Sequence, residues 1–181
     1  FRSSFLHTPG TNSTLAQADI AWEKLADVTH FHVAGPQLLP ALEGAPLASG
    51  LAEAKQRGMT TVLDTVMNPT GMNWEPLTLC FRYLDWFVPS FEEIRMLCGE
   101  ETLEGQLAIC RNAGATNVAI KRGAEGCFIA PMNQEPFTVP PLPVTVVDTL
   151  GAGDCWLGSG WAWDGITTAL RGLAAPFHGH P

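Results

Sequence analysis

The hydrophobic positions of the chain alternate between two patterns, short β-branched runs and longer segments with helical spacing. Residues 60–63, Thr-Thr-Val-Leu, form a run rich in β-branched residues that ends at Asp64, which is typical of a buried strand. Residues 46–57 have helical spacing and stop before Gly58, a residue type that commonly ends helices. The same criteria predict further strands at 29–33, 85–88, 118–120, 127–130, 137–139 and 144–147, and further helices at 19–25, 90–97 and 103–113.

Strands that alternate with helices in this way predict an α/β fold. The expected architecture is a mostly parallel, doubly wound sheet flanked by helices and built from right-handed βαβ units. In such sheets, ligands bind beyond the carboxyl ends of the strands. Asp64, Ser90, Glu93, residues 121–126 and residues 148–154 all follow predicted strands. We therefore expect these residues to share one edge of the sheet.

The sequence Asp-Thr-Leu-Gly-Ala-Gly-Asp at residues 148–154 predicts a tight turn between a strand and a helix. Gly151, Ala152 and Gly153 leave backbone N–H groups uncovered at a helix start, where orphan donors and the helix dipole favour an anion. The carboxylate of Asp154 follows directly and can serve as a base. This combination is typical of phosphoryl transfer. An ordinary turn in which Asp154 caps the helix is the alternative, and it stays open.

Composition and charge narrow the class of protein. Of the 181 residues, 46% are hydrophobic and 15% are charged, which is consistent with one domain that has its own core. The net charge is −8 and the ten Lys and Arg residues are scattered, so no basic stripe is present for nucleic acid. No apolar stretch approaches the ~20 residues that cross a bilayer, and no secretion signal opens the chain, so we expect a cytoplasmic protein without a membrane partner. The five cysteines lack a Cys-x-x-Cys pair and are interpreted as free thiols.

Four segments resemble, in the same order, those of the ribokinase-like (PfkB) carbohydrate kinases. Residues 148–154 look like the family's Asp-Thr-x-Gly-Ala-Gly-Asp signature, and residues 120–126 are similar to its nucleotide-binding Gly-x-x-Gly strand and loop. Residues 88–93 resemble its Asn-x-x-Glu segment, with serine in place of asparagine. Residues 2–12 resemble the stretch that joins the substrate lid to the core. The resemblance spans about residues 1–163 and implies a ribokinase-like fold.

The resemblance implies a reaction and the residues that perform it. The family transfers the γ-phosphate of ATP to a sugar hydroxyl, with Mg²⁺, and with a monovalent cation such as K⁺ in some members. It implies that Asp154 is the base and that the amides of residues 151–153 form an anion hole. It assigns Mg²⁺ to Glu93 and the monovalent cation to Asp148, whose plainer role is to cap the turn. It assigns nucleotide contacts to Ser90, Lys121, Arg122, Gly123, Ala124, Glu125 and Gly126.

Several of these assignments have structural alternatives that the sequence leaves open. Ser90 and Glu93 have the spacing of a capping box at a helix start. Lys121 and Arg122 fit equally well as solvated charges at the end of a strand. Asp64 fits a turn-forming residue better than a ligand.

The chain departs from the family pattern at both ends. The family's first strands, its Gly-Gly-x-x-x-Asn sugar contacts and its lid would precede Phe1, and the pattern is lost after Asp164. We therefore expect a partial kinase core at residues 1–163 and a divergent tail at 164–181. The second functional hypothesis is a non-catalytic fragment or pseudokinase remnant that at most binds nucleotide. The sequence does not identify the sugar, and a homodimer of the complete protein stays open.

Overall fold

The computed structural model describes residues 8–68, 71–141, 143, 145 and 151–158, with the backbone alone at residues 157–158. The chain divides into two compact units, Phe1–Pro141 and Leu142–Pro181. Asp148 and most of the predicted strand at 144–147 lie outside the described residues.

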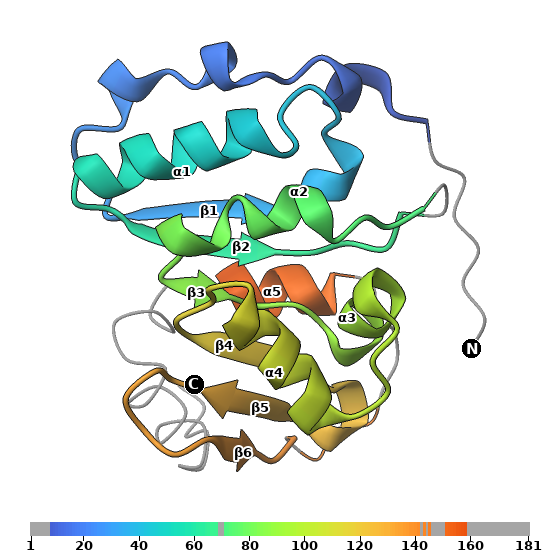
Figure 1. Ribbon diagram of the computed structural model, residues 1–181. Coiled ribbons are helices and arrows are strands. Elements are labelled where there is room, and N and C mark those ends of the chain that lie inside the picture. The colour runs from blue at the N-terminus through green and yellow to red at the C-terminus, as the bar shows by residue number, and fades with distance from the viewer. Residues whose placement is uncertain (1–7, 69–70, 142, 144, 146–150, 159–181) are drawn as a thin grey trace. The chain divides into compact units, whose positions relative to one another are not determined.

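The first unit is built on a mixed sheet whose strands follow chain order from one edge to the other (Figure 1). The described residues form six strands, of which β1 to β4 run parallel while β5 and β6 add antiparallel pairs. The predicted α/β fold with a mostly parallel sheet is therefore confirmed, and an antiparallel meander completes it. The strands are β1 (His30–Ala34), β2 (Thr60–Asp64), β3 (Trp86–Phe87), β4 (Val118–Lys121), β5 (Cys127–Ala130) and β6 (Phe137–Val139).

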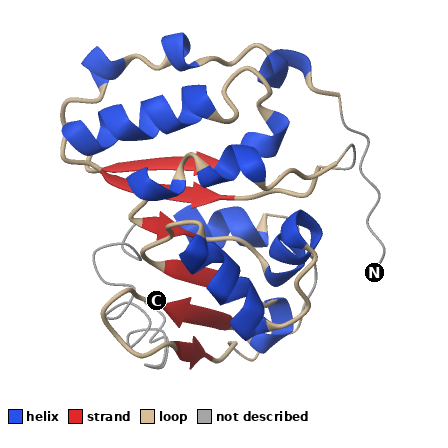
Figure 2. Cartoon of the chain, viewed as in Figure 1, coloured by secondary structure: helices blue, strands red, loops and turns tan. Residues whose placement is uncertain are grey.

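Helices connect the parallel strands, and α2 and α4 lie in front of β2 and β4 in Figure 2. The predicted helices at 46–57, 90–97 and 103–113 are confirmed to within two residues. The α-helices are α1 (Ala45–Gln56), α2 (Glu75–Thr78), α3 (Phe91–Cys98), α4 (Leu103–Asn112) and, in the second unit, α5 (Ala152–Gly158). Short 3₁₀ turns are η1 (Gly10–Ser13), η2 (Gln17–Asp19), η3 (Trp22–Lys24), η4 (Pro36–Leu38), η5 (Phe81–Tyr83) and η6 (Gly123–Glu125).

The predicted helix at 19–25 is wrong. The segment instead forms η2 and η3, separated by Ile20 in an extended conformation with φ −75° and ψ 108°. Asp19 does not begin a helix, because its Oδ2 accepts the N–H of Ala16 at 2.8 Å and closes η2. Trp22 packs on Phe31 of β1, with ring centroids 5.4 Å apart. Tertiary packing therefore overrides a helical pattern that is only two turns long.

The core of the first unit holds β2 in place. Phe81 and Phe87 are fully buried and meet edge to face, with centroids 4.9 Å apart, and Trp74 packs on both rings. On β2 itself, the Thr61 N–H donates to Oδ2 of Asp85 at 2.9 Å, which ties the strand to the segment before β3. This bond anchors the amino end of β2, while Val62 and Leu63 further along the strand are fully buried in the core.

The turn that joins β4 to β5 requires a glycine at position 126. Gly126 has φ +83°, and a Cβ built there would overlap the carbonyl oxygen of Val139 and lie 3.0 Å from the carbonyl carbon of Pro140. We expect Gly126→Ala to lower the free energy of unfolding by about 2–5 kcal/mol, of which ~1–2 come from the positive φ and ~1–3 from overpacking. Urea denaturation measures this loss.

Gly123 provides the matched control for that substitution. It also has a positive φ, +54°, but no atom lies within 4 Å of a Cβ built there. Gly123→Ala should therefore lower the free energy of unfolding only by the cost of the positive φ, about 1–2 kcal/mol. Equal losses in the two variants would contradict the role of the close approach to Val139.

Candidate functional site at the carboxyl edge of the sheet

Four residues that follow predicted strands gather at the carboxyl edge of the parallel strands. In the register of β1 and β2, Ala34 pairs with Asp64, the last residue of β2. Beyond the end of β3, Ser90 forms a parallel bridge with Lys121, the last residue of β4, and the Lys121 N–H donates to the carbonyl oxygen of Pro89 at 2.9 Å. The expected convergence of Asp64, Ser90, Glu93 and Lys121 is therefore present in the first unit.

Asp64 and Lys121 form a buried ion pair at this edge. The Nζ of Lys121 lies 2.6 Å and 2.8 Å from the two carboxylate oxygens of Asp64. The side chain of Lys121 is only 17% exposed and that of Asp64 only 8%. Burial raises the pKa of Asp64 from its ordinary 3.8 to about 6, although the ammonium group of Lys121 acts in the opposite direction and lowers it. The carboxyl group is thus mostly ionised at pH 7, and its charge is matched by Lys121.

Ser90 and Glu93 form the capping box that their spacing predicts. The Ser90 Oγ accepts the N–H of Glu93 at 3.3 Å, and Oε2 of Glu93 accepts the N–H of Ser90 at 2.7 Å. A third residue joins them, because the Thr65 Oγ1 lies 2.7 Å from the same Oε2. The structural role of the pair is confirmed, and it engages one of the two oxygens of Glu93.

The remaining oxygen of Glu93 is the group at this edge that fits a magnesium ion. Within the described residues, no hydrogen bond reaches Oε1 of Glu93, whose side chain is partly exposed. The same part of the chain has no group of three or more His, Cys, Asp and Glu side chains placed to hold a metal. Mg²⁺ keeps several waters and commonly takes one or two carboxylates together with substrate phosphates, so a single free carboxylate oxygen fits this ion.

The loop after β4 carries the other predicted nucleotide contacts, Arg122 and residues 123–126. Arg122 pairs with Glu125 through its guanidinium group, and its N–H donates to the carbonyl oxygen of Gly126 at 2.9 Å. The turn η6 lies between them, with exposed residues at 123–125. Both cations predicted for the nucleotide, Lys121 and Arg122, are thus held by carboxylates of the chain. A phosphate would have to compete with Asp64 or Glu125 for them.

The second unit contains the glycine turn and α5. Gly151 has φ +74°, and the N–H of Cys155 donates to the carbonyl oxygen of Gly151 at 2.8 Å, the first bond of the helix. Asp154 is therefore the third helical residue, so the alternative in which it is the N-cap is wrong. Residues 151–154 are exposed, and the N–H groups ahead of the first helical bond have no acceptor within the helix.

Asp64, Ser90, Glu93 and Lys121 form a cluster at the carboxyl edge of the sheet, called the edge cluster below. Thr65 also belongs to it, and sequence reasoning missed this residue. It is 4% exposed, and its N–H also donates to Oδ1 of Asp64 at 2.8 Å. The available signal was its position one residue beyond the end of a predicted strand, beside Asp64. Threonine is an ordinary residue at the end of a strand, so the sequence alone does not single out Thr65.

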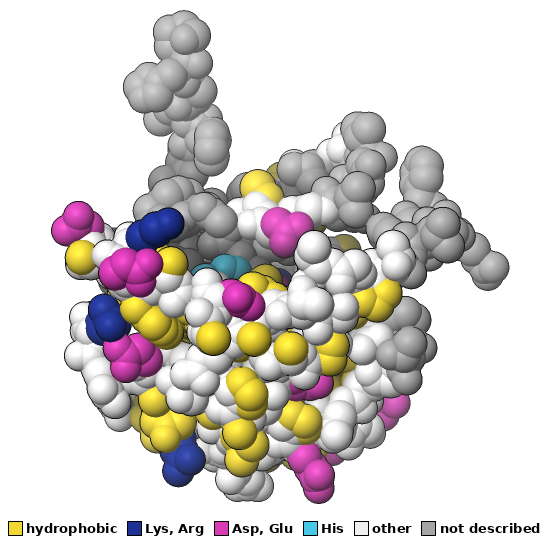
Figure 3. Space-filling view, turned by 90° about the horizontal axis from the view of Figure 1, so that it is seen from above, with side chains coloured by type: hydrophobic (Ala, Val, Ile, Leu, Met, Phe, Trp, Pro, Cys, Tyr) yellow, Lys and Arg dark blue, Asp and Glu magenta, His cyan; other side chains and the backbone are white. Residues whose placement is uncertain are grey.

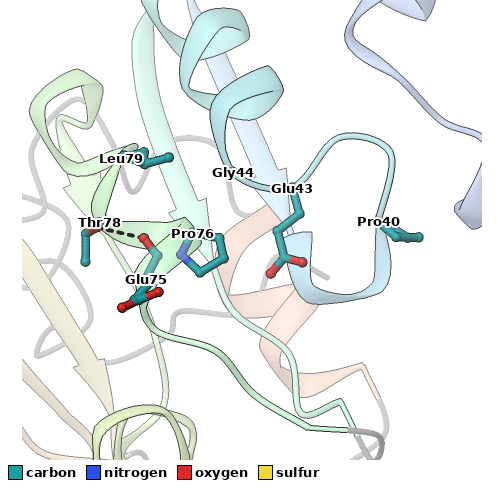
Figure 4. A pocket seen from close by; sticks show the side chains of 7 residues that line it. All are labelled: Pro40, Glu43, Gly44, Glu75, Pro76, Thr78 and Leu79. Carbon is teal, nitrogen blue, oxygen red and sulfur yellow. Dashed lines mark hydrogen bonds between the residues drawn. The ribbon is translucent and has the colours of Figure 1, made fainter.

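A separate hollow of about 590 Å³ lies near the start of α1 and α2 (Figure 4). It contains the carboxylates of Glu43 and Glu75, and burial raises the pKa of Glu43. Its lining includes none of Asp64, Ser90, Glu93 and Lys121, so the hollow is distinct from the edge cluster. The lining residues are Pro40, Glu43, Gly44, Glu75, Pro76, Thr78 and Leu79.

In Figure 3, acidic and basic groups alternate along the left side of the described surface, and the other charged groups stand apart among uncharged ones. On that face, the described Lys and Arg side chains do not gather into a patch. None of the described helices is both long and apolar enough to cross a membrane.

Comparison with known proteins places these residues in context. A family model described as pfkB family carbohydrate kinase matches residues 2–162. The 2-dehydro-3-deoxygluconokinase of Bacillus subtilis (strain 168) is 31% identical over 170 residues, which cover 90% of this chain and 50% of that protein. The chain spans about half the length of this relative.

Two solved structures show the same fold. A PfkB protein from Polaromonas sp. JS666 is 29% identical with a TM-score of 0.63, and the match covers 88% of this chain and 52% of that one. A putative ribokinase II from E. coli, in complex with ATP and Mg²⁺, is 26% identical with a TM-score of 0.65, and the match covers 85% and 51% of the two chains. The sheet of the first unit is accordingly ribokinase-like.

Proposed function

The chain belongs to the pfkB family of carbohydrate kinases, and from this premise we propose that the protein transfers the γ-phosphate of ATP to a sugar hydroxyl. The observation that carries the proposal is the gathering of Asp64, Ser90, Glu93 and Lys121 at the carboxyl edge of the sheet. In open α/β sheets, this edge is where ligands bind. An ion-paired lysine and a carboxylate with one oxygen to spare are groups suited to a nucleotide phosphate and its metal ion.

In this proposal, Asp154 accepts the proton of the sugar hydroxyl as it attacks the γ-phosphorus. The N–H groups of Gly151, Ala152 and Gly153 stabilise the charge on the transferred group, which is the role of an anion hole. A carboxylate is a weak base, but phosphoryl transfer through a loose transition state tolerates one. The exposed first turn of α5 supports this assignment, because nothing within the helix satisfies these amides.

The edge cluster would serve the nucleotide. Oε1 of Glu93 would hold Mg²⁺, largely through water, while Oε2 stays engaged by Ser90 and Thr65. When bound, the ion supplies positive charge that neutralises the phosphate oxygens. Lys121 and Arg122 would contact phosphates, with Ser90 and residues 123–126 lining the loop. Asp148 is proposed as the ligand of a monovalent cation such as K⁺.

The identity of the sugar is best approached through the relatives. The Bacillus subtilis relative and two from Escherichia coli are named 2-dehydro-3-deoxygluconokinases. We therefore propose 2-dehydro-3-deoxygluconate as the first acceptor to test, followed by ribose and other sugars. A homodimer and a cytoplasmic location remain part of the proposal for the whole protein.

The second candidate is a chain that binds nucleotide without turnover. The observation that favours it is the engagement of both predicted phosphate contacts, Lys121 by Asp64 and Arg122 by Glu125. A cation already paired with a carboxylate contributes less stabilisation to the charge of a phosphoryl group in transfer, so turnover is lowered even where the loop still contacts a nucleotide.

One assay separates the two candidates. The protein, expressed from its whole reading frame, is incubated with ATP, Mg²⁺ and each sugar of a panel, while ADP release and the sugar phosphate are followed by a coupled assay and mass spectrometry. A kinase gives sugar-dependent ADP release and a phosphorylated sugar. Binding of ATP by calorimetry without product favours the second candidate, and neither binding nor product overturns both.

A further inference from the structure

Thr65 links the end of β2 to the beginning of α3. It follows Asp64 directly, and its Oγ1 lies 2.7 Å from Oε2 of Glu93. An ionised carboxylate has no proton to give, so the threonine hydroxyl donates this hydrogen bond. The two residues are 28 positions apart in sequence, so the bond is a tertiary contact and not part of the local helix cap.

Two donors therefore meet at one oxygen of Glu93. The Ser90 N–H donates to Oε2 at 2.7 Å, and this bond alone is enough for the capping box. The last torsion of a glutamate side chain is soft and roughly two-fold, so a single donor leaves the carboxylate plane loosely defined. The hydroxyl of Thr65, in the segment that follows β2, is a second donor from outside the helix cap and defines that plane. Oε1 is then the oxygen to which no hydrogen bond is donated from the described residues.

We propose that Thr65 is a positioning residue that orients the Glu93 carboxylate so that Oε1 is presented to hydrated magnesium. This inference rests on the magnesium role proposed for Glu93. The neighbouring residue acts in parallel, because Asp64 holds the ammonium group of Lys121. Two adjacent residues at the end of β2 thus orient one anionic and one cationic group of the candidate site. A merely structural Thr65 would contribute to stability and leave metal affinity unchanged.

The test measures metal binding directly. Mn²⁺ replaces Mg²⁺ as a spectroscopic probe, and its affinity is measured by electron paramagnetic resonance with a non-hydrolysable ATP analogue present. Thr65→Val keeps the shape of the side chain and removes the hydroxyl, so we expect Mn²⁺ affinity to fall about 10-fold. Thr65→Ser keeps the hydroxyl and should restore most of the affinity. In a Glu93→Gln background, Thr65→Val should lower Mn²⁺ affinity little further, because Thr65 acts through Glu93.

The outcomes distinguish this inference from the function on which it rests. Wild-type affinity in Thr65→Val together with weak binding in Glu93→Gln would overturn the role of Thr65 alone. Equal losses in the valine and serine variants would also overturn it, since the hydroxyl would not be the cause. Wild-type affinity in Glu93→Gln would remove the magnesium role of Glu93, and this inference falls with it. Circular dichroism checks each fold, and Thr65→Ala replaces a valine variant that does not fold.

Discussion

Asp154→Asn is expected to lower the turnover number by about 10²–10⁴-fold, the usual contribution of a general base, while ATP affinity changes little. Asparagine keeps the size of the side chain but accepts no proton at neutral pH. In a merely structural role, Asp154 would only complement the dipole in the first turn of α5, a contribution of about 0.3–1 kcal/mol to stability. The two roles therefore predict very different kinetics. Steady-state assays with the sugar acceptor, together with calorimetric ATP titration, measure both quantities.

Glu104 offers a matched control for Asp154→Asn. It is an exposed acid in the first turn of α4, so Glu104→Gln removes the same kind of dipole interaction at a position with no proposed catalytic role. Its turnover should equal that of the wild type. Wild-type turnover in Asp154→Asn as well would show that the glycine turn and its carboxylate are structural.

Lys121→Met is expected to make the stability of the fold strongly dependent on pH. In the wild type, the folded-state pKa of Asp64 is about 6, above its ordinary 3.8. A raised folded-state pKa means that stability is lost as pH rises, here between about pH 4 and 6. Without Lys121, which lowers that pKa by charge and hydrogen bonding, the pKa of Asp64 rises further and the loss continues above pH 6. The slope in that window is about 1.4 kcal/mol per pH unit.

Urea denaturation of Lys121→Met across pH 5–9 tests this expectation. The free energy of unfolding of Lys121→Met should be only slightly below that of the wild type at pH 5. The difference should reach about 3–5 kcal/mol at high pH, the usual loss when one partner of a buried pair is removed. Lys55→Met is the control, because Lys55 pairs with Asp85 at 2.6 Å in an exposed position. That pair should contribute only about 0–1 kcal/mol. A deficit in Lys121→Met that does not grow with pH would contradict the coupling to Asp64.

Local patterns were sufficient to predict the elements that carry the site. The β-branched run at residues 60–63 became β2, Thr60–Asp64, because such residues pack well in a buried strand. The spacing of Ser90 and Glu93 predicted a capping box, which the structure confirms in both directions. These features depend on residues a few positions apart. The helix predicted at 19–25 failed because the packing of Trp22 on β1 outweighs a short amphipathic pattern.

The contacts that assemble the site were beyond local reasoning. Asp64 and Lys121 are 57 positions apart, and only the order and register of the strands bring them together. Thr65 was missed for the same reason, since its partner Glu93 belongs to another element. The parallel-sheet rule placed several residues on one edge, but it does not say which side chains meet. The roles of Asp154 and residues 151–153 stay predictions, and Asp148 lies outside the described residues.

The pairing of Lys121 and Arg122 with carboxylates has a consequence for how an anionic ligand arrives. The chain carries a net charge of −8, and neither cation offers an unbalanced field that would draw a polyanion from solution. Diffusional capture of free ATP is then opposed by long-range repulsion, which added salt screens beyond a Debye length of about 10 Å at 0.1 M. Moderate ionic strength should therefore speed the encounter, and the less negative magnesium complex of ATP should be captured faster than ATP alone.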